Sequence, residues 1–322
     1  MGSPFLHLSI ADWVNDQVTA FVQRYGDAFH NFSVLMLRHV LVPLEGLLRA
    51  TPPWVVLLAV GVLTWHASRR VGVAVLFVAL LWLIGCFGLW DKLMQTFALM
   101  LVATVISVAL GVPLGILASS SSAVRRVLLP VLDVMQTLPS FVYLIPVLML
   151  FGLGKVPAIL ATVVYALPPL IRLTDLGIRH VDGEIVEAAR AFGTTRAQLL
   201  FGVQLPLARP SIMAGINQTT MMALSMVVIA SMIGSRGLGE DVLAGIQTLD
   251  VGKGTQAGIA IVILAIVIDR ISQGYGQGRR TRRSMQPSRV PFRRARDTAA
   301  NDTANAGATG DAGAENTVKR AV

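Results

Sequence analysis

One polar segment of the sequence, residues 177–208, combines residue types and a spacing that suit a contact with another protein. Its marked positions are Glu187, Ala188, Ala189, Phe192, Gly193, Val203, Leu205 and Pro206. On a helix, small alanine side chains let a partner surface approach closely, and a carboxylate at the rim can meet a basic group. The chemistry expected here is recognition of a partner's groove rather than the making or breaking of bonds.

Two short helices are expected to present these positions. Asp182 suits the N-cap of the first helix, and Gly193 suits its end because glycine readily adopts positive φ. Thr195 and Gln198 have the spacing of a capping box that opens the second helix. Pro206 is then expected to redirect the chain into the next apolar segment. An ordinary capped loop is the alternative, but such a loop does not require the fixed interval from Gly193 to Leu205-Pro206.

The composition places these helices in a membrane protein. Of 322 residues, 54% are hydrophobic and only 14% charged, with a mean hydropathy of +0.66, whereas soluble domains have about 25% charged residues. The apolar residues form runs of membrane-spanning length, which predicts an all-α polytopic membrane protein. The seven expected spans are 54–68, 71–89, 93–118, 128–152, 156–176, 209–233 and 256–273.

Basic residues indicate the orientation of these spans. They gather in alternate loops, among them 177–208, and in the arginine-rich stretch that follows the last span. The positive-inside rule therefore places 177–208 and the C-terminus in the cytoplasm, and with seven spans the N-terminus lies outside. The net charge of +9 is assigned to this membrane-facing role, not to nucleic-acid binding, because no aromatic residues alternate with the arginines.

The chain divides into four regions by composition. Residues 1–53 show helical periodicity of apolar and polar residues, which predicts two amphipathic helices in the membrane interface; packing against the bundle is an equally good alternative. Residues 54–90 hold two accessory helices, and 91–275 form the core. Residues 276–322 are predicted to be a basic and then disordered cytoplasmic tail.

The span 209–233 is unusually polar, which suggests a lining for a transport path. Polar groups in a membrane must face protein or water, so these side chains either line a path or bond to neighbouring helices. The path candidates are Asn217, Gln218, Thr220, Met222, Ser225 and Met226 in this span, with Phe141 and Tyr143 from 128–152. Both methionines suit flexible packing or a gate, and the aromatic rings could face a quaternary ammonium group.

Several other residues are assigned structural roles. Gly111 and Gly115 form a G-x-x-x-G motif, typical of close helix packing. Arg172 and Asp175 have the spacing of an ion pair on one helix. The five histidines have no metal-ligand spacing, and no metal is expected.

The pattern of these segments resembles a known transporter family. The stretches 135–146 (MQTLPSFVYLIP), 166–173 (ALPPLIRL) and 215–232 (GINQTTMMALSMVVIASM), together with the Glu-Ala-Ala…Gly…Leu-Pro loop, are similar to the permease subunit of the glycine betaine/proline-betaine ABC importer. That subunit belongs to the binding-protein-dependent transport inner-membrane components, which have a type I ABC importer transmembrane domain. The resemblance covers roughly residues 10–275, and Val203 replaces a more usual isoleucine.

This resemblance implies a division of labour between chains. It implies a homodimeric permease in the bacterial inner membrane, two cytoplasmic ABC ATPases that contact the 177–208 loop, and a separate external binding protein that delivers the solute. No cofactor is expected on this chain, with ATP and magnesium on the ATPase, and the sequence lacks a phosphate-binding G-x-x-x-x-G-K-[ST] motif. The outer segment 234–255 is interpreted as a receptor-docking face or gate. A secondary transporter or osmotic channel is the alternative function, and nothing recommends an enzyme.

Overall fold

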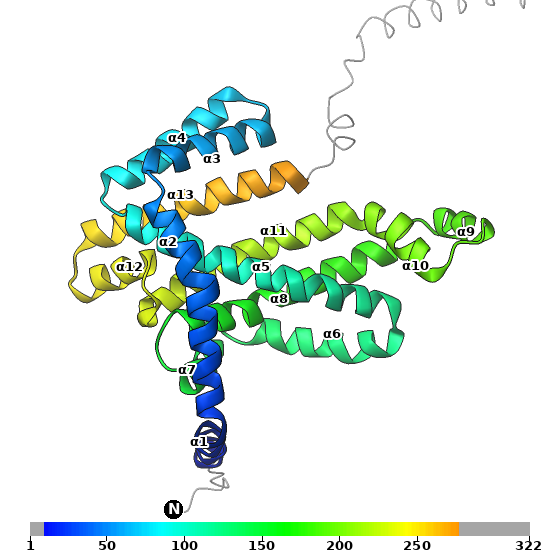
Figure 1. Ribbon diagram of the computed structural model, residues 1–322, viewed down its shortest axis with the longest axis horizontal. Helices are drawn as coiled ribbons and strands as arrows, with labels where there is room; N and C mark the ends of the chain where they lie inside the picture. Colours follow the sequence, from blue (N-terminus) through cyan, green and yellow to red (C-terminus); the bar gives the residue numbers. More distant parts are fainter. Residues whose placement is uncertain (1–9, 277–322) are drawn as a thin grey trace, which may run out of the picture. The chain divides into compact units, whose positions relative to one another are not determined.

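The protein folds entirely into helices over the range that the structure describes. The computed structural model describes residues 10–276, and every regular element in that range is helical (Figure 1). Five helical stretches are long and apolar enough to cross a membrane, and a bent pair of helices is a sixth candidate. This confirms the predicted all-α membrane class. The five stretches are Asn15–Ala50, Trp90–Ser120, Lys155–Arg179, Arg196–Ser235 and Val251–Tyr275.

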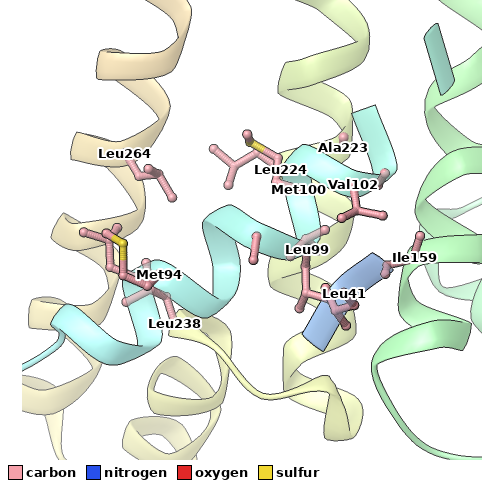
Figure 2. Packing of buried hydrophobic residues seen from close by; sticks show 14 of the residues in the cluster. Leu41, Met94, Leu99, Met100, Val102, Ile159, Ala223, Leu224, Leu238 and Leu264 are labelled. Carbon is pink, nitrogen blue, oxygen red and sulfur yellow. The ribbon is translucent and has the colours of Figure 1, made fainter. Parts of the chain in front are cut away.

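Four long helices run side by side as the centre of the bundle: α5 (Trp90–Ser120), α8 (Lys155–Arg179), α11 (Leu205–Ala230) and α13 (Val251–Gly276) (Figure 1). Figure 2 shows their apolar side chains meeting, with Leu99 of α5 and Leu224 of α11 among them. Leu99 is fully buried. Because lipid tails are as apolar as these side chains, association depends on close fit rather than on burial from water.

Glycines provide that close fit between α5 and α8. A Cβ atom on Gly111 would lie 2.8 Å from Cδ2 of Leu170, and one on Gly115 would lie 2.5 Å from Cβ of Thr174. Both distances are shorter than an ordinary carbon–carbon contact. Alanine at 111 would require the Leu170 side chain to move, and at 115 it would clash with the Thr174 Cβ atom. The G-x-x-x-G motif therefore has the structural role predicted for it.

The predicted span 128–152 is not one continuous helix, although the bent pair that replaces it is a candidate for a broken span. Two helices occupy this region, α6 (Ser122–Thr137) and α7 (Ser140–Phe151), and they are bent by 99° at the break between them. Leu138 is extended, with φ −71° and ψ 134°, as expected for a residue before proline. Pro139 has no N–H to continue the helical hydrogen bonds. Apolar composition alone did not reveal this bend.

The accessory helices α3 (Pro53–Ser68) and α4 (Val71–Cys86) form a hairpin of two 16-residue helices. Each is shorter than the ~20 residues that cross a bilayer without tilt or distortion. The C-terminal end of α3, next to the hairpin turn, lies on the last turn of α13, where the His66 ring stacks on Tyr275 with 5.6 Å between ring centres. The contact is close, because a Cβ atom on Gly274 would lie 2.6 Å from Cβ of Ala67.

The N-terminal region differs from the two separate helices that periodicity predicted. Helix α1 (Ile10–Met36) continues through a π-helical turn, η1 (Leu37–Leu41), into α2 (Val42–Ala50). In Figure 1 this rod runs across the direction of α5, α8 and α11. It contacts Phe151, Lys155 and Asp91, which mark the same end of α7, α8 and α5. Although Asn15–Ala50 is long enough to span, it lies across the bundle end, the arrangement of an interfacial helix.

Candidate functional site

The segment between α8 and α11 forms two short capped helices, as predicted. Helix α9 (Gly183–Ala191) begins at Asp182, whose carboxylate accepts a hydrogen bond from the Glu184 N–H at 3.0 Å. Just after α9, Gly193 has φ +78°, and its N–H bonds the Arg190 carbonyl at 2.9 Å. This is the left-handed residue that commonly ends a helix. Helix α10 (Arg196–Leu199) opens with the full capping box of Thr195 and Gln198.

Helix α9 presents an apolar surface that nothing in the described part of the chain covers. None of its residues is buried. Phe192, at its C-cap, is 90% exposed, and Ile185 is also exposed. Figure 1 shows α9 projecting beyond the ends of α8 and α11, at the far end of the bundle from α12 (Leu238–Gln247). Glu187, Ala188 and Ala189 lie on this helix, so the structure brings the first half of the predicted contact together.

The second half of the predicted contact lies in a helix that the prolines do not interrupt. Val203 belongs to a π-helical turn, η2 (Leu200–Gln204), and Leu205 and Pro206 begin α11. The Leu205 N–H bonds the Leu200 carbonyl five residues back. This wider turn accommodates the missing N–H of Pro206, so the predicted redirection at Pro206 is wrong.

The polar side chains of α11 are divided between bonded and open positions. Asn217 donates to Asp269 of α13 at 3.0 Å, and Thr220 donates to the Ile216 carbonyl of its own helix at 2.8 Å. Ser225 is exposed and likewise donates to its own helix, at Met221. Asn217 therefore makes an interhelical hydrogen bond, which was the alternative to a path-lining role that the sequence left open.

The methionines and aromatic residues lie in different surroundings. Met226 is fully buried in a cluster with Tyr143, whereas Met222 is half-buried. The Tyr143 hydroxyl donates to the Met135 carbonyl, and its ring packs edge-on against Tyr165 with 5.9 Å between centres. Phe141 is exposed and makes no ring contact within the described range. These rings form no shared cage in a single chain.

A cavity of about 390 Å³ opens between α6, α8 and α11. Gln218 is the predicted path residue that lines it, beside Gln136 of α6 and a set of charged groups. The full lining is Arg125, Leu129, Gln136, Pro169, Arg172, Leu173, Asp175, Leu176 and Gln218.

The charges beside this cavity are paired across helices. Asp175 is almost fully buried and binds Arg125 of α6 at 3.0 Å and Arg179 at 2.8 Å. Arg172 instead pairs with Asp133 of α6. The predicted Arg172–Asp175 pair along one helix is therefore wrong, because each side chain finds a partner on α6. The signal available in the sequence was the presence of three charged residues, Asp133, Arg172 and Asp175, within the predicted spans.

No metal centre is apparent in residues 10–276, where no group of three or more His, Cys, Asp and Glu side chains converges. The arrangement offers instead a partner-binding element at one end of the bundle, α9, and an open polar cavity beside α11.

Comparisons with known proteins agree with this arrangement. Residues 111–279 match the family model described as "Binding-protein-dependent transport system inner membrane component". The chain is 44% identical over 275 residues to the Glycine betaine/proline betaine transport system permease protein ProW of Escherichia coli (strain K12), covering 85% of this chain and 77% of ProW. It is 52% identical over 211 residues to the Glycine betaine transport system permease protein OpuAB of Bacillus subtilis (strain 168), covering 66% and 74%.

A solved structure shares the fold. The MetNI methionine ABC transporter, in an inward facing conformation, aligns with a TM-score of 0.52 at 20% identity, covering 56% of this chain and 91% of that one. This similarity shows a type I ABC importer transmembrane fold and nothing about substrate. From the family match over more than half of the sequence and the high identity to two permease subunits, we conclude that the chain belongs to the binding-protein-dependent transport system inner membrane components, which are transport subunits rather than enzymes.

Proposed function

We propose that this chain is the membrane-spanning subunit of an ATP-driven importer of glycine betaine or a related quaternary amine. Family membership supports the importer, and the names of the two relatives, which share glycine betaine, support the substrate class. A secondary transporter or channel is not favoured, because a helix held out from the bundle has no use in a machine that works alone.

The observation that carries the proposal is the uncovered surface of α9. Caps at Asp182 and Gly193 hold the helix in a fixed conformation, which lowers the entropy lost when a partner binds. Phe192 and Ile185 provide exposed apolar area, while the small side chains of Ala188 and Ala189 allow a partner surface to approach the helix closely. We assign this surface to the ATPase, with Glu187, Gly193, Val203, Leu205 and Pro206 shaping or framing it.

The assembly follows from this assignment. The end of the bundle that carries α9 faces the cytoplasm, the opposite end with α12 faces outward, and the C-terminus is cytoplasmic. Two copies of the chain pair around the path, each bound to one ATPase that holds ATP and magnesium, and a separate exported protein delivers the solute. With the rod of α1 and α2 on the outer side, the N-terminus is external.

We place the transport path beside α11, where the cavity is open. Gln218 and Gln136 line it with amides, which can hydrate a zwitterion without binding it as tightly as an unpaired charge would. Asn217 and Thr220 form the wall behind this surface. Ser225, Met222 and Phe141 continue it along α11 and α7, with the buried Met226 and Tyr143 packed behind them. Neutral polar groups suit a substrate that must leave as easily as it enters.

The test is a charge reversal on α9 with a matched control on the same helix. We expect Glu187→Arg to lower co-purification of the ATPase and betaine-stimulated ATP hydrolysis at least about tenfold, the cost of a lost contact and a new repulsion. Glu184→Arg makes the same change in net charge in the first turn of α9 and serves as the control. Equal loss in both variants, or loss in neither, would show that α9 does not contact the ATPase through Glu187.

A further inference from the structure

The connection between α11 and α12 has the features of a hinge. It begins with a π-helical turn, η3 (Ser231–Ser235), in which Ile233 and Gly234 leave the helical conformation. Gly234, Arg236 and Gly237 then have φ values of +108°, +58° and +134°. Positive φ is unfavourable for a side-chain-bearing residue such as Arg236, and such strain persists only where the surrounding structure holds it. The chain therefore breaks its helical conformation between α11 and α12 and enters α12 through a fixed turn.

The first turn of α12 is seated against α5. The Leu238 N–H donates to Thr96 Oγ1 at 2.9 Å, and the Leu238 side chain is fully buried near Met94 (Figure 2). A Cβ atom on Gly237 would lie 2.7 Å from the same Thr96 oxygen. This seat is the contact of α12 with α5. Along the rest of its length α12 packs on α13, where a Cβ atom on Gly245 would lie 2.7 Å from the Gly254 N atom, so a movement off α5 leaves Asp241 beside α13.

The buried carboxylate of Asp241 lies between two lysines from different helices. Its side chain is only 7% exposed, and its Oδ1 atom is 2.7 Å from Nζ of Lys92 on α5. Nζ of Lys253 on α13 is 3.8 Å from the same oxygen. The other oxygen, Oδ2, is buried and has no hydrogen-bond partner in the part of the chain that the structure describes.

This arrangement allows the carboxylate to change partners without losing its charge compensation. A buried carboxylate without a partner is costly, so a movement of α12 that broke one pair would be opposed. Here a small shift that lengthens the Lys92 contact can bring Lys253 into bonding distance of the unused Oδ2. Two pairings of similar energy are the requirement for a two-state element.

We propose that Asp241 is a positioning residue that exchanges Lys92 for Lys253 when α12 leaves its seat on α5, opening the outer end of the transport path. The Lys92 pair holds the closed position seen in this structure, and the Lys253 pair holds the open one. The proposal rests on the proposed function, because it assumes that this end of the bundle receives the solute from the exported receptor.

The test compares two matched substitutions in the full complex with its ATPase and receptor, reconstituted in liposomes. Lys92→Gln weakens the closed pairing, so we expect receptor-independent ATP hydrolysis to rise about five- to tenfold, the net scale of one hydrogen bond made by a partly exposed lysine. Lys253→Gln weakens the open pairing, so receptor-stimulated hydrolysis and betaine uptake should fall by a similar factor while receptor-independent hydrolysis does not rise. Rates of ATP hydrolysis and of betaine uptake are normalised to the amount of membrane-inserted protein.

Opposite directions in the two variants support the exchange. Changes in the same direction, or no change in either variant, would contradict it and indicate a static ion pair. A wild-type complex that shows no receptor stimulation would instead contradict the proposed function itself, so the two failures are distinguishable.

A cross-link keeps the proposal testable if a variant inserts poorly. In a Cys86→Ser background, which removes the single native cysteine, Lys92→Cys with Asp241→Cys is joined by a short thiol-cleavable reagent. Because this double variant lacks both charges of the closed pair, its own uptake before cross-linking is the baseline, and we expect cross-linking to stop that remaining uptake and reduction to restore it. The same reagent across His66→Cys and Tyr275→Cys, which joins α3 to α13, should leave uptake unchanged. Uptake that stays at the baseline with residues 92 and 241 joined would show that α12 does not leave α5.

Discussion

A substitution at Gly193 tests whether the backbone conformation at the end of α9 matters for ATPase binding, separately from any side-chain contact. Its φ is +78°, yet a Cβ atom added there would meet no atom within 4 Å. A substitution therefore meets no steric obstacle, and its whole cost comes from the backbone. For alanine the left-handed conformation costs about 1–2 kcal/mol, which lowers the equilibrium ratio of the correct α9 end to other conformations roughly 5- to 30-fold.

Two companion substitutions make this prediction specific. Gly193→Asn should retain most activity, because asparagine adopts the left-handed conformation more readily than other side-chain-bearing residues. Gly202→Ala serves as the control, since Gly202 lies in the nearby η2 turn, also has open space around it, and has no positive φ. There alanine should be neutral or slightly favourable to the helix.

The assay is ATPase co-purification together with receptor-stimulated ATP hydrolysis, at equal amounts of inserted protein. We expect both readouts to fall in Gly193→Ala, by up to that factor, and to stay close to wild type in Gly193→Asn and Gly202→Ala. Wild-type behaviour of Gly193→Ala would refute the claim that a fixed α9 end matters. Equal loss in the alanine and asparagine variants would refute the conformational explanation.

Two further predictions concern the packing that holds α8 in place. Gly177→Ala should lower the free energy of unfolding of the detergent-solubilised protein by about 1–3 kcal/mol, because its Cβ would lie 2.6 Å from Cβ of Ser211 on α11. Gly258→Ala serves as the control, because a Cβ there would meet no atom within 4 Å. Equal melting temperatures of the two variants would contradict the packing argument. Asp175→Asn should lower the free energy of unfolding by about 1–3 kcal/mol. Solvent weakens the two ion pairs of Asp175, because its arginine partners are partly exposed. Asp133→Asn, whose carboxylate is 64% exposed, should cost less than about 1 kcal/mol, and the reverse order in thermal unfolding would show that burial does not set the strength of these pairs.

Local signals in the sequence predicted the α9 region well. The N-cap at Asp182, the left-handed Gly193 and the Thr195 capping box depend on atoms a few residues apart, so the sequence contains all the partners involved. The same holds for the long apolar helices, whose length follows directly from composition.

Features that depend on distant residues were not predictable in this way. Arg172 pairs with Asp133 rather than Asp175, because α6 packs against α8 and places that carboxylate beside Arg172. The continuous rod of α1 and α2 is held by contacts such as Glu45 with Lys155 at 2.5 Å, which are 110 residues apart in sequence. Periodicity identifies an amphipathic face but not the surface it meets.

A permease of this kind transports only when an ATPase drives it and a receptor supplies it. Uptake of labelled glycine betaine can be measured in liposomes that contain this chain with its ATPase, with ATP inside and the receptor outside. We expect uptake that requires all three and disappears when ATP or the receptor is omitted. Uptake by this chain alone, without ATP or receptor, would rule out an ATP-driven importer and identify a secondary transporter or channel.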